Sequence, residues 1–472
     1  MAIPKEILAI ERPKNTRVKK SGNKYIVIKR TCVRRDGRNI PVELGKIGEI
    51  VDGKYYDTPK KEKKAATYSI KEYGITKALK DVSNDVFEDL MQVYGIDDAK
   101  TIYTMSILRS SYGNVTNRDL KFRYDTSYIS ETIPGISLSE NTVSKFIDIL
   151  GRKYHLISKF MNDRLETLND NNLILVDGTL KNSAVETSDF TEWSRKSKTK
   201  GSESISILYA VDATTGEPLA EKVYPGNMLD QTSFNDFLDE FKLENAIIIG
   251  DKGTITNKVL LKLKEKNNLS YLFPLKRNDN RIKLYDLYSY ESTFTHDNDT
   301  VLYKKKEIDG MYFYSFKNAT DEARERKGYL THQNNKETFD IEKFNKKEKS
   351  FGSIVFISDK NIEPKDIYTM YDRRWEIENF FNFYKNVINL EAIRVQDDTS
   401  IIGSEFINFI SSLISIKFKN SLREKAINEK LSFKQIVHYL TKIKKIQKPN
   451  GSWINCTTLK YISELGVKLG VI

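Results

Sequence analysis

Two acidic residues follow apolar runs of the kind that form buried strands. Asp177 lies in ILVDGT and Asp251 in IIIGDKG, and glycine follows each acid within two residues. Acids at strand ends emerge at the edge of the sheet, where open α/β folds bind their ligands. For either acid alone a turn is the better explanation, because Asp-Gly is a common turn pair. Two such acids on adjacent strands would repel each other, and a divalent metal ion would remove that repulsion.

A third acid belongs to a regular pattern further along the chain. Residues 363–389 are expected to form one helix, in which Tyr371, Arg374, Glu378 and Lys385 have the spacing Y-x2-R-x3-E-x6-K. At about 100° per residue the four side chains fall within an arc of roughly 60°. An apolar stripe about 90° away is expected to pack on the sheet. The polar stripe offers a carboxylate to a metal and cations to phosphate oxygens. Without the two aspartates, a solvated Arg374–Glu378 salt bridge would be the better explanation.

The composition narrows the ions that such a site would bind. The chain has 472 residues, two cysteines and four scattered histidines, which excludes a disulfide framework, a multi-cysteine zinc site and a histidine-rich metal centre. Carboxylate ligands favour hard ions such as Mg²⁺ or Mn²⁺. Lysine and arginine outnumber aspartate and glutamate by 77 to 65, a net charge of +12 that points to a polyanionic partner.

Taken together, these residues resemble bacterial insertion-sequence transposases of the DDE class, within the group marked by the Y-R-E-K signature. The segment YPGNMLDQTSF (224–234), with its Gly226, Asn227 and Asp230, also resembles that group, as does the run that begins at IIIGDKG. A long segment expected to be β-rich before Glu378 fits the same group. The resemblance covers about 170–395 and has lysine at position 252 where arginine is commoner, and both residues supply a cation.

The resemblance implies an RNase H-like catalytic core with a two-metal mechanism. Asp177, Asp251 and Glu378 would be the catalytic residues and would hold two Mg²⁺ ions, for which Mn²⁺ would substitute. The implied activity is that of a DNA transposase. Such an enzyme binds the terminal inverted repeats of an insertion sequence, cleaves the ends by hydrolysis and joins the 3′-hydroxyl to target DNA. No covalent enzyme intermediate is implied.

The resemblance also implies the partners of the protein. Double-stranded DNA would be bound both as transposon ends and as target, by a homodimer in the synaptic complex. Arg374 and Lys385 would hold phosphates of the transposon end, and Tyr371 would contact the same backbone. Two alternatives remain open at this point. One is a metal-dependent nuclease without strand transfer, and the other is a transposase-derived DNA-binding regulator with an inactive core.

The order of expected elements gives the fold class. Residues 173–278 are expected to run strand, hairpin, helix, strand, helix, strand, which is typical of an α/β layered fold with a mixed sheet. The expected organisation is a basic strand-bearing segment (1–68), a helical region that binds DNA ends (69–165), the first part of the RNase H-like core (166–277), a β-rich insertion (278–350), the second part of the core with the helix of Glu378 (351–395) and a helical C-terminal region (396–472).

Three further segments each have a functional and a plain explanation. Residues 12–35 carry ten basic residues and no acidic ones, so they form either a DNA-contacting arm or a solvated face. A helix capped by Ser139 resembles the second half of a helix-turn-helix, although ordinary packing explains it better. The loop 191–204 carries Arg195 and three lysines and is expected either to touch DNA or to be solvated.

The chain is expected to act in the cytoplasm, at the nucleoid, and not in a membrane. Its first residues have no apolar core of a secretory signal, and two cysteines suit a reducing compartment. The most apolar stretch, 401–418, contains Glu405 and Asn408. It is therefore expected to be a buried helix and not a membrane span.

Overall fold

Two structural units follow each other along the chain, Met1–Tyr68 and Ser69–Ile472. The computed structural model describes residues 3–35, 38–58, 69–113, 115–168, 172–194, 202–253, 256–266, 268–333, 339–427, 429–456 and 458–472.

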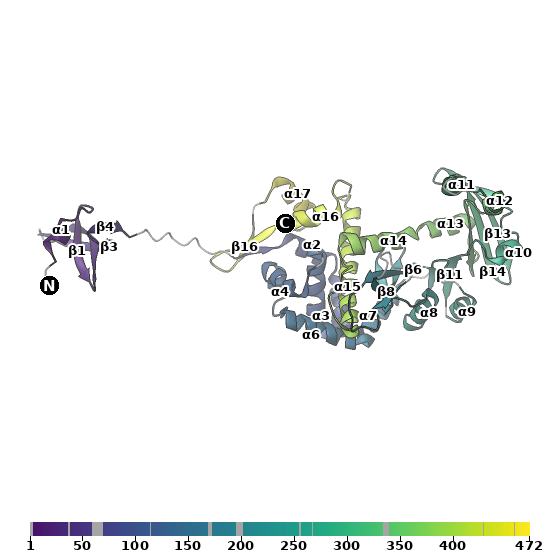
Figure 1. The fold of residues 1–472 in the computed structure, drawn as a ribbon, viewed down its shortest axis with the longest axis horizontal. Coiled ribbons are helices and arrows are strands. Elements are labelled where there is room, and N and C mark those ends of the chain that lie inside the picture. The colour runs from purple at the N-terminus through teal and green to yellow at the C-terminus, as the bar shows by residue number, and fades with distance from the viewer. Residues whose placement is uncertain are drawn as a thin grey trace. The chain divides into compact units, whose positions relative to one another are not determined.

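The first unit is an antiparallel sheet in the order β1-β2-β3-β4, preceded by a short helix (Figure 1). Val18, Val27 and Ile50 form its small core, and Ile7 of the helix packs against them. These side chains come from β1, β2, β3 and α1, so each element contributes to the one apolar cluster. The elements are α1 (Lys5–Ala9), β1 (Thr16–Ser21), β2 (Lys24–Arg35), β3 (Arg38–Val51) and β4 (Lys54–Asp57).

A large mixed sheet dominates the second unit. Among the described residues ten strands join it, in the order β12-β13-β14-β15-β11-β10-β6-β8-β7, with β9 paired to β8. The neighbours β6, β10 and β11 are parallel, and the strands outside them are antiparallel. The strands are β6 (Asn172–Asn182), β7 (Glu192–Trp193), β8 (Glu203–Asp212), β9 (Pro218–Pro225), β10 (Ala246–Ile249), β11 (Leu269–Pro274), β12 (Ser292–His296), β13 (Asp299–Ile308), β14 (Met311–Asn318) and β15 (Ser353–Ser358).

The predicted order of core elements is confirmed. Strand β6 is followed by the β8–β9 hairpin, helix α8 (Asp230–Glu240), β10, helix α9 (Asn257–Glu265) and β11. One detail differs, because β6 does not end at Asp177. It continues to Asn182, since pairing with β8 runs from Ile174 to Asn182 without interruption. Asp177 therefore lies inside a strand, whereas Asp251 follows the end of β10.

Helices from both ends of the second unit pack together around α15 (Asp398–Glu424), which lies beside α3, α6 and α7 (Figure 1). Helices α6 and α15 approach each other at two glycines: a Cβ on Gly151 would lie 1.7 Å from the carbonyl oxygen of Thr399, and one on Gly403 would lie 2.1 Å from that of Ile147. Ser139 caps α6, as predicted. The N-terminal helices are α2 (Gly74–Asp81), α3 (Asn84–Tyr112), α4 (Asn117–Thr126), α5 (Ile129–Thr132), α6 (Glu140–Arg152) and α7 (Tyr154–Leu165).

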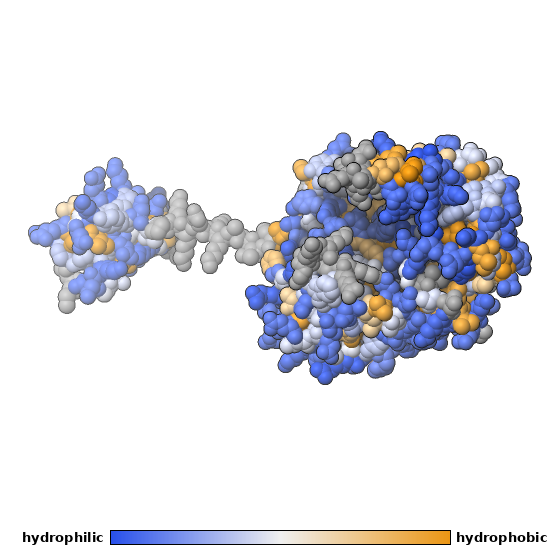
Figure 2. All heavy atoms as spheres, turned by 45° about the vertical axis from the view of Figure 1, so that its right-hand side comes forward, coloured by the Kyte–Doolittle hydropathy of each residue, from blue (hydrophilic) through white to orange (hydrophobic). Residues whose placement is uncertain are grey.

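Helix α15 contains the apolar stretch noted in the sequence. By length and composition it would cross a membrane, but 89% of its most apolar 18-residue window is buried inside the protein. The prediction of a buried helix is thus confirmed for this segment. Figure 2 shows that the visible face of the second unit is mostly hydrophilic, with hydrophobic residues scattered over it.

The segment 278–350 is less β-rich than expected. Its strands β12, β13 and β14 extend the large sheet through β15, but three helices surround them. The prediction of a largely β segment therefore describes only its middle part. The helices were not predicted because their polar sequences have few apolar residues at regular helical spacing. The helices are α10 (Asn280–Leu284), α11 (Ala319–Gln333) and α12 (Ile341–Glu348).

The C-terminal residues return to the start of the second unit. Strand β16 pairs with both β17 and β5, which joins the two ends of this unit in one small sheet. Helix α16 begins at a capping box formed by Ser432 and Gln435. The remaining elements are β5 (Ile70–Glu72), α16 (Phe433–Leu440), β16 (Lys444–Gln447), β17 (Trp453–Asn455) and α17 (Lys460–Lys468).

Candidate active site

The parallel pairing of β6 and β10 brings the two aspartates to the same level of the sheet. In the register of this pair, Ile249 is opposite Leu175. Asp251 and Asp177 each lie two residues further on. The carboxyl groups are close enough for the charge of Asp251 to act on Asp177. The expectation of two acids on adjacent core strands is therefore met by the topology.

The segment that carries Glu378 is not one regular helix, so the prediction of a single helix over 363–389 is wrong. Helix α13 (Pro364–Asp372) ends before Arg374, α14 (Trp375–Asn382) carries Glu378, and a π-helix, η1 (Phe383–Val387), follows. Hydrogen bonds between residues three apart tighten the backbone around Arg374, as in a 3₁₀-helix. The π-helix loosens it again. Each change alters the direction in which the following side chains leave the helix axis. A prediction that assumes one constant angle per residue therefore does not apply across this segment.

Apolar packing positions α14 beside the sheet. The ring of Tyr209 on β8 contacts the rings of Phe380, Phe381 and Tyr384, with centroids 5.0–5.9 Å apart. Helix α14 also contacts β6, the strand of Asp177. The apolar stripe of the sequence thus packs on the sheet as predicted, and this packing brings Glu378 toward the aspartates.

Arg374 bonds to one of the three acids and feels the charge of the other two. Its guanidinium group is 2.9 Å from Oε1 of Glu378. Burial by itself would lower the pKa of Arg374, but the charges of Tyr371, Glu378, Asp251 and Asp177 outweigh it and raise the pKa. Asp177, Asp251 and Glu378 therefore share one electrostatic environment with Arg374.

The sequence assigned no role to a fourth acid in the same place, Asp230 at the start of α8. A Cβ placed on Gly253 would lie 3.5 Å from Oδ2 of Asp230 and 3.7 Å from Oδ2 of Asp251. The charge of Asp230 also acts on Asp177. The segment 224–234 contained the signal, since its resemblance to the transposase group included Asp230.

The chemistry of these donors fits a hard divalent cation. Burial raises the pKa of Asp177 to about 6, and the charges of Asp251 and Asp230 add to this, while a hydrogen bond from the Gly178 backbone N–H opposes it. Carboxylates crowded in this way are what a divalent ion relieves. In the described part of the chain, however, no three acid, histidine or cysteine side chains lie close enough together to bind one ion. Glu378 is held by Arg374 in this structure.

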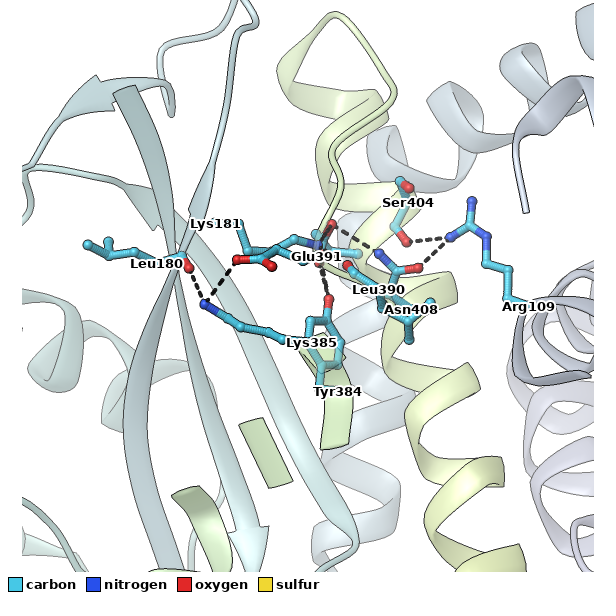
Figure 3. A network of polar contacts seen from close by, with 10 residues as sticks. Arg109, Leu180, Lys181, Tyr384, Lys385, Leu390, Glu391, Ser404 and Asn408 are labelled. Carbon is cyan, nitrogen blue, oxygen red and sulfur yellow. Dashed lines mark hydrogen bonds and ion pairs between the residues drawn. The ribbon is translucent and has the colours of Figure 1, made fainter. Parts of the chain in front are cut away.

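Lys385 and Tyr371 make protein contacts in this structure. Lys385 Nζ donates a hydrogen bond to the carbonyl oxygen of Leu180 (2.5 Å) and lies 3.7 Å from the carboxylate of Glu391 (Figure 3). Tyr371 is packed against Phe356, with ring centroids 4.4 Å apart. Lys385 therefore links η1 to β6, and DNA contacts for both residues stay predictions.

A buried ion pair connects the strand of Asp177 to α15 (Figure 3). Lys181 is fully buried, and its Nζ lies 2.8 and 2.9 Å from the two carboxylate oxygens of Glu405. The same ammonium group donates to the Tyr384 hydroxyl (3.0 Å) and to the Leu390 carbonyl (2.7 Å). Asn408 completes the shell of Glu405 by donating to it at 3.1 Å. This network joins β6, η1 and α15 through side chains.

A cavity of about 680 Å³ opens beside Asp251. Lys252, Arg374 and the 60% exposed Trp375 line it, together with residues of β11, β15 and α11. Of the three candidate acids only Asp251 lines this cavity, which carries cations and further acidic side chains and is large enough for part of a nucleic-acid backbone. Of the 191–204 loop, residues 195–201 with their four cations lie outside the described residues, so that prediction stays open.

The raised pKa of Asp177 predicts a stability change without metal. The folded carboxyl titrates near 6 and the unfolded one near 3.8, so the folded state binds more protons between these values and loses stability as the pH rises through them. Asp177→Asn removes this loss, on the order of 3 kcal/mol above pH ~6. Thermal unfolding in EDTA should show the variant more stable at pH 8 and equal to wild type near pH 4. Equal midpoints at pH 8 would contradict the expectation.

The sequence of the sheet region matches a known family. Residues 169–401 match the family model described as the transposase DDE domain. Asp177, Asp251 and Glu378 all lie within the matched residues, as do Tyr371, Arg374 and Lys385.

Solved structures and curated proteins give two further comparisons. Among solved structures, a cryo-electron microscopy structure of the piggyBac transposase synaptic complex with hairpin DNA matches with a TM-score of 0.42 and 11% sequence identity. The match covers 80% of this chain and 82% of that chain. No curated protein matches the sequence.

Proposed function

We propose that this protein is a DNA transposase that moves an insertion sequence by cutting and joining. It would bind the terminal inverted repeats, cleave the element ends by metal-dependent hydrolysis and join the freed 3′-hydroxyl to target DNA. The observation that carries the proposal is that Asp177, Asp251 and Glu378 all act electrostatically on Arg374 within the residues that match the transposase DDE domain model. An RNase H-like core is part of the proposal, and the mixed sheet with parallel β6 and β10 at its centre is compatible with it.

The three acids would hold Mg²⁺, or Mn²⁺ in its place, as two ions. Bound there, the ions would supply Lewis-acid polarisation of the scissile phosphate and activation of the attacking oxygen. The carboxylates of Asp177, Asp251 and Glu378 would fix the position of the reacting phosphate relative to β6 and α14. Separation of Arg374 from Glu378 would free that carboxylate and leave the guanidinium for a phosphate oxygen, which it matches in a bidentate geometry.

The proposed reaction consists of two phosphoryl transfers. In the first, the oxygen of water bonds to phosphorus and the bond from phosphorus to the 3′ oxygen of the element breaks. The element keeps a 3′-hydroxyl, and the flanking DNA keeps a 5′-phosphate. In the second, that hydroxyl oxygen bonds to a phosphorus of the target, whose own 3′ oxygen leaves. The first transfer consumes one water molecule and one phosphodiester bond. The second breaks one phosphodiester bond and forms another, so neither requires an energy-rich cofactor.

Tyr371 and Lys385 would take up the transposon end. Lys385 would exchange its contact with Leu180 for a phosphate, and Tyr371 would pack against the DNA backbone near Arg374. A homodimer would hold two ends, in the cytoplasm at the nucleoid. The cavity beside Asp251 supports this arrangement, because it places Lys252 and Trp375 where a backbone would approach the acids.

A cleavage assay on DNA that flanks the coding sequence in its genome tests the proposal. Linear DNA with both flanks is incubated with protein in Mg²⁺ or in EDTA, and pre-cut ends are incubated with a supercoiled target. The expected results are cuts at two inverted repeats that require metal, and joined products from the pre-cut ends.

The two alternatives give different results in the same assay. Metal-dependent cuts without any joined product from pre-cut ends would identify a nuclease. Specific protection of the ends without cleavage in either Mg²⁺ or Mn²⁺ would identify a DNA-binding regulator. Absence of any DNA binding would overturn the proposal as a whole.

A further inference from the structure

Half of the β2–β3 hairpin in the N-terminal unit is a ribbon of only two strands. In the described residues, β1 pairs with the first half of β2 alone, and β4 pairs with the second half of β3 alone. Residues 30–35 and 38–43, called the ribbon here, pair only with each other. A bulge at Leu44 separates the ribbon from the rest of the sheet, and the neighbouring Gly45 has a φ of 122°. Such a bulge bends the ribbon out of the sheet.

The two faces of the ribbon differ in chemistry. Directly opposed residues share a face, and the face alternates along each strand. Arg34 is opposed to Asn39, and Arg30 lies four residues before Arg34 on the same face. Val33 is opposed to Ile40 on the other face, which also carries Arg38 at its end. Arg34, Asn39, Val33 and Ile40 are all exposed, so neither face is covered by the unit itself.

The charge on the arginine face is not neutralised by its own acid. Glu43, opposed to Arg30, is bonded to Lys19 at 2.7 Å and lies 3.5 Å from Arg17, both on β1. Among the described residues no ion pair engages Arg34. With ten basic and no acidic residues in 12–35, the ribbon projects from a strongly positive strand pair. A polyanion complements this surface.

We infer that the ribbon enters the major groove of duplex DNA with Arg30, Arg34 and Asn39 against the base edges. The major groove admits a two-stranded β-ribbon. Arginine pairs with guanine and asparagine with adenine through two hydrogen bonds each, so Arg34 and Asn39 side by side are suited to read neighbouring base pairs. The inference rests on the proposed function and assigns sequence recognition to the first unit.

The experiment compares full-length variants on two kinds of DNA. Short duplexes from the cleaved ends and scrambled duplexes of equal composition are titrated with protein by fluorescence anisotropy. Arg34→Ala and Asn39→Ala should each reduce the preference for end DNA by about tenfold to a hundredfold, with little change on scrambled DNA. Arg34→Lys should lose the same preference, because it keeps the charge but not the bidentate geometry.

Two matched controls lie on the same unit. Lys54→Ala removes an exposed cation from the opposite end of the sheet, and Val33→Ser changes the other face of the ribbon; both should keep the full preference for end DNA. All substituted side chains are exposed, and thermal unfolding checks that each variant is folded.

Three results would overturn the inference. In the first, Arg34→Lys keeps the full preference for end DNA, and Arg34→Ala binds both duplexes more weakly to the same degree. Arg34 would then contact only a phosphate. Loss of preference in Val33→Ser together with a changed oligomeric state in sedimentation would make the ribbon a protein contact. Undiminished preference in Arg34→Ala and Asn39→Ala would remove the ribbon from DNA recognition. In all three, metal-dependent cleavage by the wild type leaves the proposed function standing, and only its absence counts against that function.

Discussion

Replacing Glu378 by glutamine is expected to abolish cleavage of the element ends while binding of the same DNA persists. The amide has nearly the shape of the carboxylate but no negative charge, so it cannot balance a divalent ion at the acids. A loss of metal-assisted catalysis corresponds to a rate decrease of about three orders of magnitude or more, about 4 kcal/mol in the barrier. Single-turnover cleavage with labelled ends measures the rate, and anisotropy measures the binding.

The same result is expected for Asp177→Asn and Asp251→Asn, because all three acids act on the same Arg374. Glu376→Gln is the matched control. It removes a carboxylate from the same helix α14, two residues before Glu378, where the charge of Glu376 acts on Lys419. The control should cleave at the wild-type rate. Undiminished cleavage in any one of the three site variants would exclude that residue as a metal ligand.

Replacing Lys181 by methionine is expected to give the largest loss of stability of any single substitution discussed here. The change leaves the carboxylate of Glu405 buried without its cation, and one-sided removal of a buried ion pair costs about 3–5 kcal/mol. The hydroxyl of Tyr384 would still donate to Glu405, but the Leu390 carbonyl would lose its donor. Urea unfolding followed by circular dichroism should show the loss as a lower midpoint.

Two further variants separate the buried pair from general effects of losing a lysine. Adding Glu405→Met to Lys181→Met should recover most of the stability, because two apolar groups then fill the space of the pair. Lys222→Met, on β9, removes a partly exposed lysine 2.7 Å from Asp236 and should cost at most about 1 kcal/mol. A double variant as unstable as Lys181→Met would mean that the backbone and Tyr384 contacts matter more than the ion pair.

The buried pair also has a consequence for the active site. Lys181 lies four residues after Asp177 on β6, and Tyr384 lies six residues after Glu378. Both bond to Glu405 on α15, so one carboxylate fixes the strand of one acid relative to the helix of another. Helix α15 is therefore part of the frame that sets the distance between the acids, although it contributes none of them.

Much of the core could be predicted because its signals are local. The apolar runs before Asp177 and Asp251 predicted two strands, and TTGEP predicted the turn of the β8–β9 hairpin. The apolar residues at helical spacing around Glu378 predicted which side faces the sheet, and Tyr209 contacts that side. In each case the side chains that decide the element are neighbours in sequence.

The helix break and the π-helix could not be predicted in this way. The spacing of Tyr371, Arg374, Glu378 and Lys385 is compatible with one straight helix, and no proline or glycine marks the break. The break depends on contacts with distant residues. Lys385 is bonded to Leu180, and the ring of Tyr384 packs on Tyr209, each across more than one hundred residues of chain.

The sequence by itself determined which residues are available for catalysis and the order of the elements that carry them. Three acids, their apolar strands and the transposase signature are all properties of short segments. Only the tertiary structure decided that Asp177 and Asp251 act on Arg374, that Asp230 is beside Asp251 and that Lys181 is buried against Glu405. These contacts join residues far apart in the chain. Their energies depend on burial and on neighbouring charge, which arise only once the sheet and α15 have packed together.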